Sequence, residues 1–220
     1  MKKIMLLVFT VILISCNSAN KNESNESEQT PSEQKIDYKN VKDKSFDELF
    51  TSIEPNQIPE DVFTLVGKDY SVITAGTLSD YNSMVASDGG MGLLMSKPVT
   101  FCGLRGSRYT LEIILKDKIY TMSYFEEQFK DQFMLFGQKS GRDSDKMKET
   151  TLTPVSTPSG KVSYKEAKII IECELAQTHT VNMDEVYADK NKTFYTDAYN
   201  EVGSYHKIVF GDITNVWIRK

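Results

Sequence analysis

The chain has 220 residues and a formal net charge of −5, and it shows no stripe of basic residues. Such an acidic chain is not expected to bind nucleic acid. It contains two histidines and three cysteines, and none has the spacing of metal ligands, so a zinc or haem site is not expected either.

The N-terminus has the pattern of a lipoprotein signal peptide. Lys2 and Lys3 precede an apolar run over residues 4–14, which has the length of a signal-peptide core and is too short to span a bilayer. The run ends in Leu-Ile-Ser-Cys, which resembles the lipobox of bacterial lipoproteins. We therefore expect cleavage after residue 15, a lipid on Cys16, a mature chain of charge −7, and an extracytoplasmic position at the cell envelope. The alternative is an ordinary secretory signal that ends near a cysteine.

A polar tether and one domain are expected after the cleavage site. Residues 16–45 would form the lipidated cysteine and the tether, because residues 17–35 are mostly Asn, Ser, Glu and Gln, with little to bury. Residues 46–220 are long enough for one domain with a sizeable core.

Within the domain, short β-branched or aromatic runs predict strands over residues 70–75, 82–86, 99–104, 119–124, 168–175 and 207–213. A helix is predicted over residues 110–115, with Thr110 as its N-cap. A second helix is predicted over residues 126–138, where Phe129, Phe133 and Phe136 recur at helical spacing and should pack inward. Many short strands with two inserted helices indicate a mainly β fold, a barrel or a sandwich.

Export would permit a disulfide between Cys102 and Cys173. However, Ile169, Ile171 and Cys173 share one face of a predicted strand. We therefore expect Cys173 to be a small buried residue rather than half of a disulfide.

The segment from Val99 to Thr110 carries the strongest chemical signal. A strand leads into a tight turn, and a helix begins at its end. The guanidinium groups of Arg105 and Arg108, two hydroxyl groups and the N–H groups of a helix start therefore converge, and each favours an anion such as phosphate. Gly106 would let the backbone approach closely. The alternative is a solvated turn whose arginines pair with surface carboxylates.

Two further segments are consistent with a nucleotide-like ligand. Residues 140–146 follow the second helix, where Gly141 suits a helix C-terminus and Asp143 or Ser144 suits the next N-cap. Taken alone, this pattern indicates only the end of one helix and the start of another. Residues 81–92 pass from a strand into a glycine-rich stretch, whose exposed backbone could bind a planar heteroaromatic ring. The alternative there is a hairpin with a glycine-rich turn.

Together, these segments resemble the flavin reductase-like family, whose fold is the FMN-binding split barrel. The resemblance runs from about Asp69 to the C-terminus and includes Asn-Ser-Met at 82–84, Arg-Gly-Ser-Arg-Tyr-Thr at 105–110 and Ser-Gly-Arg-Asp at 140–143. It implies an FMN-binding split β-barrel, non-covalent FMN, oxidoreductase activity of flavin reductase type and a homodimer. The positions that match the family's FMN-binding residues are Asn82, Ser83, Met84, Val85, Ala86, Ser87, Cys102, Gly103, Leu104, Arg105, Ser107, Arg108, Thr110, Ser140 and Lys146.

The chain also departs from the family pattern. Asp88 stands where members often carry a tryptophan, and Met95-Ser96 stands where they often have another tryptophan before Asn-Lys-Pro. Loss of these rings would weaken stacking on the flavin. No catalytic acid or base is predicted, since His206 is expected to be structural. NAD(P)H, the usual reductant of the family, is a cytoplasmic pool, so either electrons come from a membrane-bound chain, or the domain has kept the fold without the reductase activity. The alternative functions are a non-enzymatic lipoprotein that binds flavin or another phosphorylated planar ligand, and an interaction protein with an empty barrel.

Overall fold

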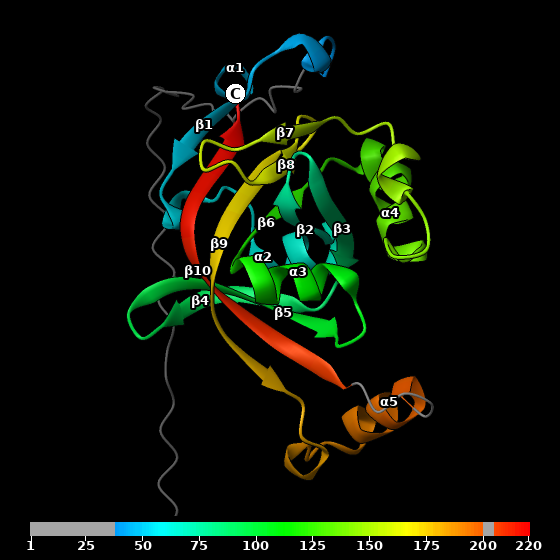
Figure 1. Ribbon diagram of the computed structural model, residues 1–220. Coiled ribbons are helices and arrows are strands. Elements are labelled where there is room, and N and C mark those ends of the chain that lie inside the picture. The colour runs from blue at the N-terminus through cyan, green and yellow to red at the C-terminus, as the bar shows by residue number, and fades with distance from the viewer. Residues whose placement is uncertain (1–37, 200–204) are drawn as a thin grey trace, which may run out of the picture. The chain divides into compact units, whose positions relative to one another are not determined.

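The computed structural model describes residues 38–199 and 205–220. The expected signal peptide, Cys16 and most of the expected tether lie outside these residues. The strands are β1 (Phe50–Ile53), β2 (Ser71–Thr77), β3 (Asp80–Ala86), β4 (Gly89–Leu94), β5 (Lys97–Arg105), β6 (Ile119–Tyr124), β7 (Pro154–Ser156), β8 (Val162–Tyr164), β9 (Ile169–Thr180) and β10 (His206–Arg219). The α-helices are α1 (Phe46–Leu49), α2 (Val62–Thr64), α3 (Tyr109–Asp117), α4 (Lys130–Gln138) and α5 (Asp189–Tyr199) (Figure 1).

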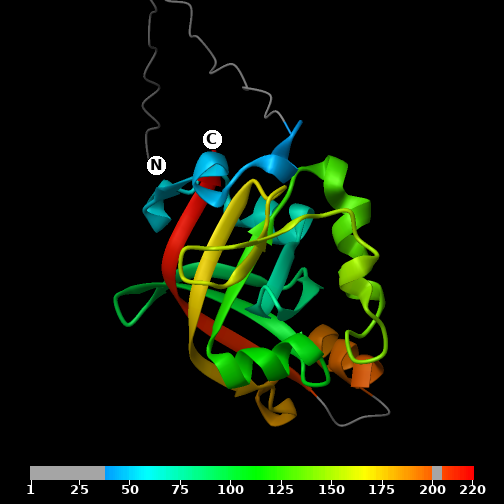
Figure 2. The same ribbon diagram turned by 45° about the horizontal axis from the view of Figure 1, so that its top comes forward.

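One antiparallel sheet forms the frame of the domain, in the order β3-β2-β6-β9-β10-β5-β4, with β1 paired to β10. The small β7–β8 hairpin is separate from it. The sheet curls but is not closed, because β3 and β4 each have one strand partner among the described residues (Figure 2). All six predicted strands are present, and the expected mainly β split-barrel fold is confirmed.

The long strand β10 pairs with three other strands of the sheet. It pairs with β9 along most of its length, with β5 through His206–Asp212, and with β1 through Val216–Arg219. Its register shifts between Phe210 and Gly211, where a side chain on Gly211 would collide with the Tyr120 hydroxyl and with Cys173. A bulge at a glycine lets this strand bend around the core.

Two hydrophobic clusters fill the domain. One lies inside the curled sheet and contains Leu104, Met122 and Cys173, and the other packs α4 and the N-terminal helices against the outer face. Phe133 and Phe136 of α4 are buried in the second cluster, which confirms the predicted inward stripe.

Residues 38–69 also belong to the compact domain. Val41 is buried in the outer cluster and Leu65 in the inner one. The ammonium group of Lys168, at the start of β9, binds the carboxylates of Glu60 at 2.6 Å and Asp69 at 2.8 Å. Packed structure therefore begins before residue 46, where the sequence predicted the domain to start.

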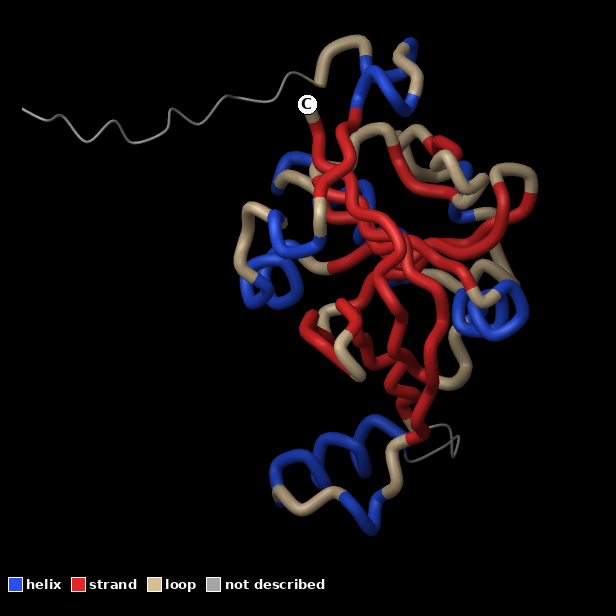
Figure 3. Tube along the Cα trace, turned by 90° about the vertical axis from the view of Figure 1, so that its left-hand side faces the viewer, coloured by secondary structure: helices blue, strands red, loops and turns tan. Residues whose placement is uncertain are grey.

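Two projections were not predicted. Strands β4 and β5 form a hairpin whose turn residues Met95 and Ser96 have φ of 49° and 64°. The glycine-rich segment is thus strand β4, in which Gly90 lies against the ring of Phe101 and could not carry a Cβ without displacing it. The second projection is α5, which lies between β9 and β10 in the chain and beyond the end of the sheet where the start of β10 pairs with both β9 and β5 (Figures 1 and 3).

Candidate functional site

The loop from β5 to α3 brings positive charge to a helix start. Strand β5 ends at Arg105, and a turn closed by the Arg108 N–H donating to the Arg105 carbonyl, at 3.0 Å, leads into α3. Arg108 is the N-cap of α3 and makes no side-chain capping bond. The prediction that Thr110 is the N-cap is wrong, because Thr110 is the second residue of the helix. The N–H groups of the first turn and Arg108 therefore lie together, as the anion interpretation requires.

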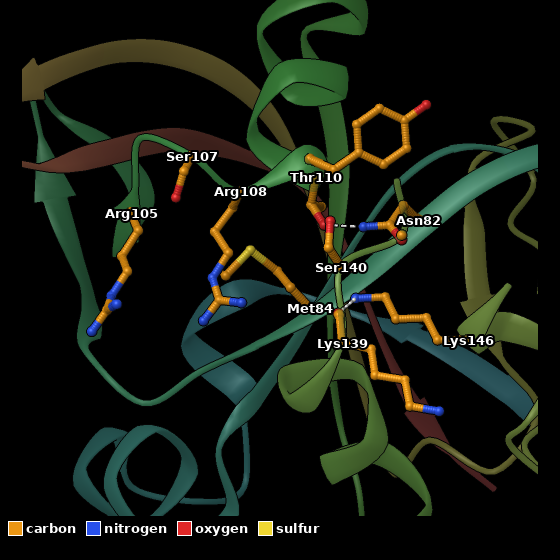
Figure 4. A pocket seen from close by; sticks show the side chains of 11 residues that line it. Asn82, Met84, Arg105, Ser107, Arg108, Thr110, Lys139, Ser140 and Lys146 are labelled. Carbon is orange, nitrogen blue, oxygen red and sulfur yellow. Dashed lines mark hydrogen bonds between the residues drawn. The ribbon is translucent and has the colours of Figure 1, made fainter. Parts of the chain in front are cut away.

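A cavity of about 200 Å³ opens beside this loop (Figure 4). The three segments singled out in the sequence all contribute to its wall. The lining residues are Asn82 and Met84 of β3, Arg105, Ser107, Arg108, Tyr109 and Thr110 of the β5–α3 loop and α3, and Lys139, Ser140, Gly141 and Lys146 after α4.

Four cationic side chains line this anion cavity, and Lys146 is the most enclosed, with 3% of the residue exposed. Its ammonium group donates to the carbonyls of Phe136, at 2.7 Å, and Lys139, at 3.0 Å, at the end of α4. Burial, and then the positive charge of Arg108, lower the pKa of Lys146 to about 8. Burial and Arg105 also lower the pKa of Arg108. An anion in the cavity would relieve this repulsion between like charges.

Asn82 joins the three segments of the wall. Its side-chain amide donates to the Thr110 hydroxyl at 2.7 Å (Figure 4). On its other side lies Gly141, where any Cβ would collide with the side-chain oxygen Oδ1 of Asn82. Helix α4 ends at Gln138, so Gly141 is not the helix C-terminus that the sequence predicted. Its lack of a side chain instead lets the chain approach β3 closely.

Arg142 is a site residue that sequence reasoning missed. Its guanidinium group donates to the Ser107 carbonyl at 2.8 Å, forms an ion pair with Glu112 of α3, and lies 5.2 Å from the ring centre of Tyr109. Arg142 therefore fastens the loop after α4 to the loop before α3. A planar guanidinium suits this combination of fork and ring contacts, which lysine cannot reproduce.

The family model described as "Flavin reductase like domain" matches residues 67–220. The chain belongs to this family. No curated protein sequence matches it. Among solved structures, an FMN-binding protein from Thermus thermophilus with bound p-hydroxybenzaldehyde is 20% identical (TM-score 0.52; 68% of this chain and 70% of the other covered). The flavoredoxin of Desulfovibrio vulgaris (Miyazaki F) is 18% identical, with a TM-score of 0.52 over 76% of this chain and 76% of the other. An FMN-binding domain of a flavin reductases-like enzyme from Shewanella baltica OS155 is 12% identical, with a TM-score of 0.54 over 77% of this chain and 76% of the other.

In this flavin reductase like domain, the remaining predicted β3 residues do not line the anion cavity. The Ser83 hydroxyl bonds Tyr164 at 2.6 Å and Thr74 at 2.7 Å, in the buried interior. Val85 packs toward α4, Ala86 is part of the inner core, and Ser87 is exposed. What β3 can still offer a ligand is its backbone, because β2 is its only ladder partner among the described strands.

The predicted β5 residues also separate by strand alternation. Cys102 and Leu104 point into the inner core, whereas Gly103 lies on the opposite face beside Asp88 and His206. Burial raises the pKa of the Cys102 thiol well above its ordinary value. Cys102 and Cys173 are both free and buried, so Cys173 is the small core residue that was expected.

The described residues have neither a metal-binding cluster nor a membrane-spanning helix. No group of three or more His, Cys, Asp or Glu side chains there could hold a metal ion. Within the same residues, no helix is long and apolar enough to cross a bilayer.

Proposed function

We propose that this protein is an FMN-binding oxidoreductase of flavin reductase type. The observation that carries the proposal is the anion cavity, where Arg108, Lys146 and the first turn of α3 converge. Arginine, lysine and helix N–H groups together suit a dianionic phosphate. The family match and the FMN-binding proteins among the structural relatives support FMN as the ligand that carries it.

The residues present fit the phosphate end of FMN. A cavity of about 200 Å³ is smaller than the roughly 300 Å³ at which pockets for drug-sized ligands begin. It would therefore hold the phosphate group, and the free backbone edge of β3 would be available to the rest of the cofactor. Asn82 and Met84 form the wall on that side.

Bound FMN would supply the hydride or electron chemistry at its ring. The chain's own part is to bind the phosphate through Arg108 and Lys146, and to keep the two loops together through Arg142 and Asn82. None of the described lining residues is proposed as an acid or base. Burial lowers the pKa of His206, with a partly opposing effect of Asp88, so its imidazole is neutral near pH 7.

We further propose a lipid anchor on Cys16 and a position outside the cytoplasm, on the evidence of the sequence pattern alone. The electron donor would then be a membrane-bound chain or another reductant outside the NAD(P)H pool. A homodimer is also proposed, supported by the exposed apolar tip of the β4–β5 hairpin, where Leu93 is 77% and Met95 88% exposed.

One spectroscopic experiment tests the function. The purified protein is incubated with FMN, freed of unbound cofactor, and examined by visible absorption before and after addition of an electron donor, NADH or NADPH, and finally after addition of the chemical reductant dithionite. A yellow protein whose flavin band is bleached by one of these donors supports the oxidoreductase. A yellow protein that only dithionite itself bleaches supports the non-enzymatic binding module. A protein that retains no flavin refutes both.

A further inference from the structure

A second cavity, of about 430 Å³, lies where the segment before the family match packs against the rest of the domain. It shares no lining residue with the anion cavity. Its volume falls within the range of roughly 300–1,000 Å³ typical of small-molecule sites. The lining residues are Tyr38, Asn40, Val41, Lys42 and Asp43 of the N-terminal segment, and Phe129, Thr151, Leu152 and Glu166 of the matched domain.

The N-terminal wall of this cavity is fastened to the domain by three kinds of contact. Val41 is buried in the outer hydrophobic cluster. The ammonium group of Lys165 donates to the Lys42 carbonyl at 2.7 Å. The ring of Tyr38 packs edge-on against that of Phe129, with their centres 4.8 Å apart. The cavity is therefore a built part of the fold and not a space beside an unattached segment.

Glu166 places a buried charge in the wall, with 4% of the residue exposed. Its Oε2 accepts a hydrogen bond from the Thr153 N–H at 2.8 Å. Within residues 38–199 and 205–220, its carboxylate forms no ion pair and accepts no second hydrogen bond. The other oxygen, Oε1, is not one of the fully enclosed unpaired atoms, so it remains accessible. Buried charges in proteins are normally paired, and Glu166 therefore has an oxygen available for a partner.

The other buried charged side chains are compensated more completely. Lys146 donates to two backbone carbonyls, and Lys168 pairs with two carboxylates. Glu172 accepts hydrogen bonds from hydroxyl groups and from a side-chain amide. A buried carboxylate with one backbone donor lowers the stability of the fold. Glu166 thus stands apart from the three others, and it is the one that lines this cavity.

The other polar groups near the cavity do not supply that partner. Arg219 and Glu166 act on each other electrostatically, but the Arg219 guanidinium lies 4.7 Å from the ring centre of Tyr38 and donates to two backbone carbonyls. Lys42 and Asp43 are exposed and have opposite charges. Burial raises the pKa of Tyr38 far above its ordinary value, so its hydroxyl is neutral. The enclosed part of the cavity is therefore negative because of Glu166 alone.

We propose that this cavity is a binding site for a small organic ammonium ion with an apolar body. The ammonium group donates to the available oxygen of Glu166, and the apolar body packs against Val41, Phe129 and Leu152. A hydrogen bond between two charged groups is about twice as strong as one between neutral groups. The apolar walls favour an organic cation over a hydrated inorganic one. The site does not depend on the proposed FMN site, because the two cavities have different walls.

The test uses the full-length protein and 4-fluorobenzylammonium as the probe, with binding followed by fluorine NMR of the probe. Wild type should bind it with a dissociation constant on the order of 0.1–1 mM, as expected of so small a ligand. 4-Fluorobenzyl alcohol has the same ring without the charge and should bind at least about tenfold more weakly. 4-Fluorobenzoate, with the opposite charge, should not bind detectably. No binding of the ammonium probe, or equal binding of the ammonium and the alcohol, would overturn the proposal.

Glu166→Gln removes the charge and keeps an oxygen that can accept from the Thr153 N–H. It should weaken binding of the ammonium probe roughly 10- to 100-fold. Its melting temperature should be unchanged or higher, because an incompletely compensated buried charge is lost. Glu127→Gln is the matched control, since Glu127 lies outside the cavity with a side chain that is 68% exposed. It should alter binding by less than about twofold, and equal losses in the two variants would contradict the proposed contact.

A competition experiment separates this site from the flavin. FMN at saturating concentration should leave the probe bound, because the two cavities share no residue. Displacement of the probe by FMN would place the probe in the flavin site and overturn the proposal. Failure of FMN to bind would contradict the proposed function and leave the probe result intact. The comparison of the three probes on wild type decides the proposal even if Glu166→Gln does not fold.

Discussion

The Asn82 side chain donates a 2.7 Å hydrogen bond to the Thr110 hydroxyl, and this bond ties the edge strand β3 to the first turn of α3. Both residues are buried, so the bond is shielded from water. It fixes the distance between the strand proposed to support the flavin and the helix start proposed to bind its phosphate. The same Asn82 is in contact with Gly141, so one side chain sets the spacing of all three segments of the site.

Gly141→Ala should therefore weaken FMN binding at least tenfold, because the new methyl group would collide with Asn82 and push the loop after α4 away. The matched control is Gly92→Ala, since a Cβ at Gly92 meets nothing within 4 Å. The double variant Asn82→Ala/Gly141→Ala should bind FMN better than the product of the two single effects predicts, since the clash is removed. Isothermal titration of FMN into wild type, the two single variants, the double variant and the control measures these affinities. Strict additivity would contradict the proposed contact.

Arg108→Ala should weaken FMN roughly 10- to 100-fold and riboflavin hardly at all, because a charge-assisted hydrogen bond contributes about 1.5–3 kcal/mol and only FMN carries the phosphate. Arg105→Ala should have a smaller effect, since its side chain extends away from the other cavity residues (Figure 4). Lys116→Ala, on the exposed side of α3, controls for net charge. Fluorescence quenching of both flavins gives the ratio, and equal losses for FMN and riboflavin would exclude a phosphate contact.

FMN affinity should also depend on pH through Lys146. Its pKa is lowered to about 8 in the free protein, and a bound dianion would raise it, so binding takes up a proton between the two values. Affinity should then be nearly constant between about pH 7 and 7.5 and fall above pH 8 by at most tenfold per pH unit. The phosphate itself titrates near pH 6 and does not contribute in this range.

Two comparisons isolate that lysine. Riboflavin, which lacks the phosphate, should show no such fall, and Lys146→Met should give weaker FMN binding that is independent of pH between 7.5 and 9.5. Lys148→Met serves as the control, because Lys148 pairs with Asp145 at the surface. A pH dependence that persists in Lys146→Met would assign the proton to another group.

The anion loop could be predicted because its chemistry is contiguous in sequence. A strand end, a turn and a helix start follow one another between residues 99 and 110, so local rules place Arg105 and Arg108 together. Strand alternation also separates the side chains at 82 and 84 from that of Ser83, which bonds Tyr164 in the interior. That separation was available from the sequence, but the resemblance assigned the whole run to the cofactor.

Other features depend on contacts between distant segments. Position 141 needs a glycine because of the neighbouring Asn82 side chain, and Arg142 is held by its hydrogen bond to the Ser107 carbonyl. No local sequence pattern connects these residues. Helix α5 is rich in polar residues and lacks a clear apolar stripe, so periodicity did not reveal it. The glycines of β4 were interpreted as an exposed backbone surface or the turn of a hairpin, whereas they lie within a strand in which Gly90 makes room for the ring of Phe101.

Arg142→Lys should weaken FMN binding about three- to tenfold while changing thermal stability little. Lysine keeps the charge but cannot bond Ser107, pair with Glu112 and cover the Tyr109 ring at once. An exposed ion pair contributes only about 0–1 kcal/mol to folding, so a loss of affinity without a loss of melting temperature identifies Arg142 as a positioning residue. Glu112→Gln, which leaves the Ser107 bond in place, should have a smaller effect. A parallel fall in affinity and melting temperature would indicate a purely structural role.

The segment before the family match should matter for stability through Lys168. Its ammonium group joins Glu60, which precedes the match, to Asp69 and the start of β9, and its side chain is only 9% exposed. Lys168→Met should lower the free energy of unfolding by about 3 kcal/mol, because it leaves a poorly solvated carboxylate without its partner. Lys148→Met breaks an ion pair in which the lysine is 84% exposed and should cost less than about 1 kcal/mol. Urea denaturation of both variants measures the difference. Asp69→Asn/Lys168→Met should recover part of the loss if the orphaned carboxylate is its cause, because Asp69 is the less exposed of the two carboxylates at 11%. Equal effects of the two lysine variants would show that residues 38–66 are not fastened to the domain by this cluster.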